Sequence, residues 1–180
     1  MKRIIIPAAL LASTTIASAQ PSLTESAPAP TSDEHAYYVQ AGAELGGAQG
    51  AVFLAPTIEA GVRLGSGPLW AHGMILSGGA GEIDEANTTG TILQVRGGVE
   101  ARTCSASRIA CASAGIDVGY SHAQVMAEDW TDKWSGGMLI PRVGLDVGGD
   151  HLRVRPGVEV GFDSKGWNQL GLTAAVAYQW

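Results

Sequence analysis

Strict alternation of apolar and polar residues is the feature that most limits how this sequence folds. Between Ala51 and Leu64, apolar residues stand at every second position, and Thr57, Glu59 and Arg63 fall between them. Because successive side chains of a β-strand point to opposite faces, this segment predicts a strand with one apolar and one polar face. Glycine is abundant, with 25 residues, and it is unfavourable inside helices, so the pattern indicates an all-β protein.

The alternation recurs in about eight segments, several of them about ten residues or longer and therefore able to cross a bilayer as tilted strands. One segment, 69–77, is ambiguous because Trp70, His72 and Leu76 on one face are as bulky as Leu69 and Ile75 on the other. The predicted strands are 37–46, 51–64, 69–77, 91–102, 112–121, 139–147, 152–162 and 170–180.

Charged residues fall on one parity of these strands and consist of six carboxylates and six arginines. Arginine without lysine, matched in number by carboxylates, is suited to a narrow interior in which buried charges pair. We expect these side chains to form an ion-pair network in a barrel lumen. They are Glu44, Glu59, Glu100, Asp117, Asp146 and Glu159, with Arg63, Arg96, Arg102, Arg142, Arg153 and Arg155.

A soluble lipocalin-like barrel is the alternative, with the apolar face lining a ligand cavity and the charges in water. A solvated face would normally carry lysine as well as arginine. The composition therefore favours a membrane barrel, and the net charge of −6 does not suggest nucleic acid as a partner.

The beginning of the chain predicts export. A basic start, an apolar stretch and the small residues Ala17 and Ala19 are typical of a signal peptide, which we assign to 1–19. Residues 20–35 are rich in proline, serine, alanine and acids, and predict a disordered periplasmic segment. The barrel is expected at 36–180.

The last segment ends in Trp180, with Tyr178 and further apolar residues at every second position before it. This pattern resembles the carboxy-terminal signal by which outer-membrane barrels are recognised by their assembly machinery. The chain resembles the OmpA/OmpX type of small eight-stranded barrel. That resemblance implies one antiparallel up-and-down transmembrane barrel in the bacterial outer membrane, with lipids and the barrel-assembly machinery as partners, and a monomeric state.

The connections alternate in character along the chain. With an even strand count and a periplasmic amino terminus, the more polar connections are expected at the cell surface and the tight turns in the periplasm. Aromatic residues collect at bilayer interfaces, so Tyr37, Tyr38, Tyr178 and Trp180 are interpreted as periplasmic anchors. The expected surface connections are 46–50, 80–90, 128–135 and 164–168, and the tight turns are 65–68 and 148–150.

Two local features need separate treatment. Cys104 and Cys111 are closely spaced in an exported chain and predict a disulfide. Pro56, Pro141 and Pro156 fall within predicted strands, where each removes a ladder hydrogen bond. Either β-bulges lie at these prolines, or some strands end earlier than drawn.

Catalysis and cofactors are weighed from the few candidate groups. His122, beside Ser121 and upstream of Glu128 and Asp129, is the candidate for a lipid A-modifying enzyme. However, adjacent strand residues point to opposite faces, and the position two after His122 is Gln124 rather than serine.

The remaining histidines, His35, His72 and His151, look isolated, so no metal site and no cofactor are expected. The sequence therefore predicts a non-enzymatic barrel with a structural or surface-interaction role, an unidentified surface ligand and a plugged lumen. A narrow pore is the alternative.

Overall fold

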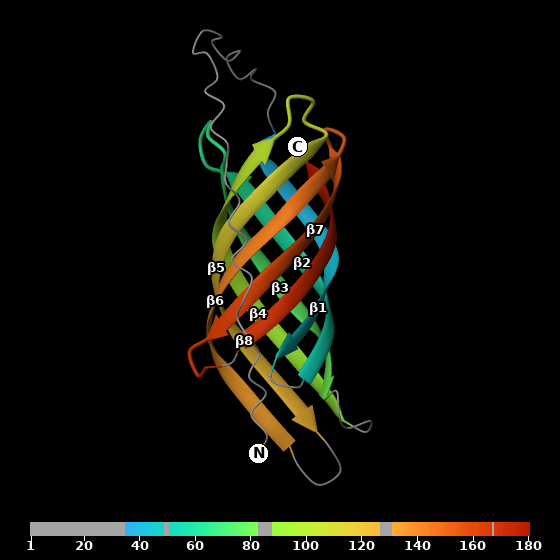
Figure 1. Cartoon of the computed structure of the whole chain (residues 1–180), viewed down its shortest axis with the longest axis vertical. Coiled ribbons are helices and arrows are strands. Elements are labelled where there is room, and N and C mark those ends of the chain that lie inside the picture. The colour runs from blue at the N-terminus through green and yellow to red at the C-terminus, as the bar shows by residue number, and fades with distance from the viewer. Residues whose placement is uncertain (1–34, 49–50, 83–87, 127–130, 167) are drawn as a thin grey trace, which may run out of the picture. The chain divides into compact units, whose positions relative to one another are not determined.

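The computed structural model describes residues 35–48, 51–82, 88–126, 131–166 and 168–180, which form one closed barrel. The eight strands follow one another around the barrel in chain order, and β8 closes antiparallel on β1 (Figure 1). The predicted up-and-down meander is confirmed. The strands are β1 (Tyr37–Ala48), β2 (Ala51–Arg63), β3 (Leu69–Glu82), β4 (Thr89–Cys104), β5 (Ala110–Met126), β6 (Thr131–Gly148), β7 (Leu152–Asp163) and β8 (Asn168–Gln179).

Residues 1–34 carry the predicted signal peptide and nearly all of the predicted N-terminal segment, and they lie outside the described residues. Among the residues that are described, no helix is long and apolar enough to cross a membrane.

Several strands are longer than the alternation predicted. β3 runs on to Glu82, and β6 already begins at Thr131, inside a predicted connection. These extensions are rich in glycine and polar residues, which conceal the alternation, yet their backbones pair with the neighbouring strand. Before Met138, β6 pairs with β5 alone, so the β5–β6 hairpin reaches past the end of β7 (Figure 1).

The parity of β3, ambiguous in the sequence, is settled by its register with β2. Glu59 pairs with Met74, and Thr57 pairs with Leu76. Trp70, Met74 and Leu76 are therefore buried on the same side as the charged residues of β2, while Leu69 and Ile75 are exposed on the outer side.

The strand prolines are accommodated without bulges, so both of the expected solutions are wrong. Pairing of β6 with β7 stops at Leu139 and resumes at Arg142 in the same register. Pairing of β2 with β3 likewise stops at Leu54 and resumes at Thr57, on either side of Pro56. In an antiparallel sheet, the N–H and C=O of one residue face the same neighbour. Each proline therefore weakens one ladder only, and Pro141 and Pro156 keep their places opposite β5 and β8.

The outer surface of the barrel is apolar around its circumference, whereas most charged residues of the strands lie inside. A soluble barrel with an apolar ligand cavity requires the reverse arrangement, and so large an exposed apolar surface needs a nonaqueous partner. An apolar belt around a polar interior is typical of transmembrane barrels. Representative exposed residues are Val39, Leu45, Leu54, Ile58, Ile75, Val95, Val118, Val143, Leu145, Val154, Val158, Leu172 and Val176.

A charge on this belt tests its contact with lipid. Leu172 lies near the middle of β8 with 55% of its surface exposed. In lipid vesicles, Leu172→Arg should lower the free energy of unfolding by about 2–4 kcal/mol, because the guanidinium enters hydrocarbon. Leu172→Val is the matched control and should change it little. Equal urea midpoints for the arginine variant and the parent would contradict a lipid-facing belt.

Candidate functional site

The interior of the barrel is the candidate site, because it gathers nearly all of the predicted ion-pair residues. Eleven of the twelve have side chains that are buried or mostly buried inside the barrel. Arg63 is the exception: at the end of β2, its Nε donates to the carbonyl of Gly67 at 2.9 Å and its Nη2 to that of Ser66 at 3.1 Å. The hydrogen bonds described for Arg63 thus go to carbonyl oxygens of the turn after β2, and they do not include a carboxylate of the predicted network.

Glu100 is the centre of a cluster toward the end of the barrel that carries the β4–β5 turn and the carboxy terminus. Its Oε1 accepts from Arg155 Nη2 at 2.8 Å and from Arg102 Nε at 2.7 Å. Its Oε2 accepts from Arg142 Nη2 at 2.9 Å, while Arg142 Nη1 reaches Glu59 Oε2 at 2.7 Å. Arg142 therefore joins carboxylates of β2 and β4 from its place on β6.

Arg153 links the same end of the interior to the turns. It pairs with Asp146 and donates to the carbonyl oxygens of Gly149 and Arg108, both of which lie in turns at this end. Beside it, Cys104 and Cys111 pair across β4 and β5 and are joined at an S–S distance of 2.09 Å.

Aromatic rings close the interior at the end that carries the β4–β5 turn. The guanidinium of Arg102 lies 4.3 Å from the ring centroids of both Tyr38 and Trp70, and the Tyr38 hydroxyl donates to Glu59. The interpretation of Tyr38 as a membrane anchor is wrong, because its side chain points inward. Tyr38 and Glu44 fall on the same parity of β1, and this is the sequence signal that places the Tyr38 side chain inside the barrel.

Arg96 holds a second group at mid-barrel. Its Nη1 lies 2.5 Å from Glu159 Oε1 and its Nη2 lies 3.1 Å from Glu44 Oε2. The amide of Gln169 donates to Glu44 Oε1 at 2.8 Å, and Arg96 also donates to Gln94. All of these side chains are buried.

Toward the end of the barrel that carries the β5–β6 hairpin, the interior is apolar. Phe53, Leu76, Ile92 and Ala123 form a buried cluster, with Trp134 packed against it. The sequence analysis missed this cluster, although Phe53 stands on the charged parity of β2. Gly46, opposite Phe53, leaves room for the ring, since a Cβ there would lie 2.1 Å from Phe53 Cζ.

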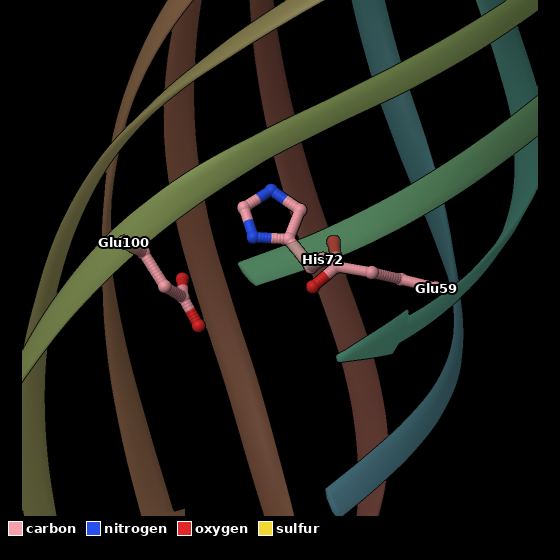
Figure 2. Close-up of side chains that lie close together, drawn as sticks. All are labelled: Glu59, His72 and Glu100. Carbon is pink, nitrogen blue, oxygen red and sulfur yellow. The ribbon is translucent and has the colours of Figure 1, made fainter. Parts of the chain in front are cut away.

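His72 belongs to the charged interior, so its interpretation as isolated is wrong. Its Nε2 lies 2.8 Å from Asp117 Oδ1, with both side chains fully buried. Figure 2 shows the ring between the carboxylates of Glu59 and Glu100, and ligand atoms of these three residues lie within 4.8 Å of one another.

This group has the residue types of a metal site but not its electrostatics. Every carboxylate oxygen of Glu59 and Glu100 already accepts a hydrogen bond from arginine or tyrosine. A divalent cation would add two charges where arginines already balance the carboxylates, and a buried excess charge is costly. We therefore assign these residues to the ion-pair network.

Of the residues considered for catalysis, the two that the structure describes, Ser121 and His122, lie on opposite faces of β5. Ser121 is buried and its hydroxyl accepts from Gln94 at 3.3 Å, whereas His122 is exposed on the outer face. Glu128 and Asp129 lie outside the described residues. The predicted assembly-signal residues Tyr178 and Trp180 are exposed and stack on one another, with Tyr37 beside Trp180.

No family model and no curated protein matches the chain. Among solved structures, it is similar to Neisserial surface protein A, with a TM-score of 0.67 and 16% identity, over 80% of this chain and 97% of that one. Ail, the attachment invasion locus protein of Yersinia pestis, gives 0.61 and 8%, over 82% and 99%. The N-terminal β-barrel domain of Pseudomonas aeruginosa OprF gives 0.54 and 10%, over 78% and 97%. The fold is thus that of small outer-membrane barrels, as the sequence resemblance predicted.

The buried ion pairs can be tested by removing one partner. Arg96→Ala leaves two carboxylates without their guanidinium, and breaking a buried pair in this way costs about 3–5 kcal/mol. We expect this variant to lose its heat-modifiable gel migration at a lower temperature than the parent. Leu93→Val, on the outer face of the same strand, is the control and should change it much less. Equal effects of the two substitutions would mean that the mid-barrel interior is wet.

Proposed function

We propose that this chain is an integral outer-membrane barrel with a structural or surface-interaction role, whose lumen is plugged and whose activity is not enzymatic. The observation that carries the proposal is the filling of the interior. Tyr38 and Trp70 close one end, arginine–carboxylate pairs occupy the middle, and the cluster around Phe53 closes the other end. An eight-stranded barrel is narrow enough for side chains to fill it.

Outer-membrane lipids are the proposed surroundings of the apolar belt, and the barrel-assembly machinery is the proposed partner in insertion, with Tyr178 and Trp180 in its signal. We propose a monomer, because the eight strands close into a barrel and none of them is an edge strand over its full length. A surface role is supported by the extended β5–β6 hairpin and by the fold shared with a surface protein and an attachment protein.

Conductance separates the plugged barrel from the narrow pore. The purified, oxidised protein in planar bilayers should show little steady conductance, because ions would have to pass both an apolar layer and closed ion pairs. A known porin in the same bilayers controls for insertion. Stable large channels from the unmodified protein would refute the plug.

Orientation is tested separately. We propose that the connections at the β5–β6 end face outward, so an epitope tag inserted beside Asp129 should bind antibody on intact cells. A tag in the turn at Gly149 is the matched control and should bind antibody only after the outer membrane is permeabilised. The opposite pattern would reverse the topology and remove the support for a surface role.

A further inference from the structure

The mid-barrel group contains two carboxylates but one guanidinium. Glu44 from β1 and Glu159 from β7 both bind Arg96 of β4, and the exposed fractions of the three side chains are 0%, 2% and 1%. Two ionised carboxylates with one arginine would leave a net negative charge in a desolvated interior, which is strongly unfavourable unless a further positive charge is present.

The two carboxylates also converge in space. A Cβ built on Gly171 would lie 2.8 Å from Glu44 Oε1 and 3.2 Å from Glu159 Oε1. Both oxygens therefore crowd the same point, where the Cβ of any other residue at position 171 would lie. An alanine there would push against both acids at once.

The surrounding strands do not supply the missing charge at this level. Arg142 stands opposite Glu159 in the β6–β7 ladder, but its guanidinium is directed to Glu59 and Glu100. The other residues directly opposite Glu44, Glu159 and Arg96 in the ladders are uncharged: Ala55 of β2, Met74 of β3, Gly119 of β5, and Gly171 and Thr173 of β8.

The neighbouring cluster toward the β4–β5 turn has as many arginines as carboxylates. Its four carboxylates meet four arginines, and His72 lies against Asp117 within the same cluster. These groups are Glu59, Glu100, Asp117 and Asp146, with Arg102, Arg142, Arg153 and Arg155.

We propose that Glu44 and Glu159 form a proton-binding site, in which one proton is shared between the two carboxyl groups while Arg96 balances the remaining negative charge. The protonated carboxyl donates to the ionised one, and the group as a whole is neutral. No bond other than the O–H bond forms or breaks, and the proton comes from water during folding. Like charges held side by side in a protein commonly settle in this way.

Infrared spectroscopy of the folded protein tests the proposal directly. At neutral pH the parent should show the carbonyl band of a protonated carboxylic acid, and Glu159→Gln should lack it, because Glu44 is then ionised against Arg96. Glu100→Gln, in the balanced cluster, is the matched control and should keep the band. A parent without this band, or a band unchanged in Glu159→Gln, would overturn the shared proton.

Stability gives a second readout. Raising the pH to the alkaline range removes the proton, so the parent should lose more of its urea midpoint than Glu159→Gln, in which the titrating pair is absent. The groups that titrate elsewhere are the same in both proteins, so the difference isolates the pair. Equal losses in the two proteins would contradict the proposal.

A bound alkali ion would be the other source of positive charge. Midpoints measured in sodium chloride and in choline chloride at equal ionic strength distinguish the two. We expect equal midpoints in both salts at neutral pH; a parent that is more stable in sodium, with Glu159→Gln insensitive to the salt, would replace the proton by a metal ion.

Discussion

A charge removed from water must meet an opposite charge, and in this barrel that requirement joins strands that the sheet itself does not connect. Ladder hydrogen bonds link each strand only to its two neighbours. Arg142 of β6 reaches Glu59 of β2, and Arg155 of β7 reaches Glu100 of β4. The ion pairs therefore brace opposite walls of the barrel against one another, and glycines such as Gly98 and Gly171 leave room for the charged side chains.

Much of the fold could be predicted from the sequence because alternation is a local property. In the segment around Glu59, neighbouring side chains report the two faces directly, and confining charge to one parity shows which face must be shielded from lipid. The same reasoning failed where the pattern weakens. Glycine and polar residues at the ends of β3 and β6 gave no alternation, although backbone pairing needs no particular side chain.

The site could be predicted by residue type but not by partner. Parity places Arg63 and Arg96 on one face, yet only their depth along the tilted strands decides that Arg63 meets turn carbonyls and Arg96 meets two carboxylates. For the same reason His72 looked isolated: Asp117 is 45 residues away in the chain. The sequence predicted six acids with six arginines, whereas the described ion pairs join the six acids to five of these arginines, one at mid-barrel and four toward the β4–β5 turn.

The prolines of β6 and β7 have a mechanical consequence. The β1–β8 ladder pairs every residue from Tyr38 to Ala48, whereas the β6–β7 ladder is interrupted twice, at Ile140–Pro141 and at Leu145–Asp146. Between these gaps, a cleft lined by Gly144, Pro156 and Gly157 reaches Arg142 through the wall. Fewer paired residues join β6 to β7 than join β8 to β1, so we expect local opening of the barrel to begin between β6 and β7 and not at the β1–β8 seam.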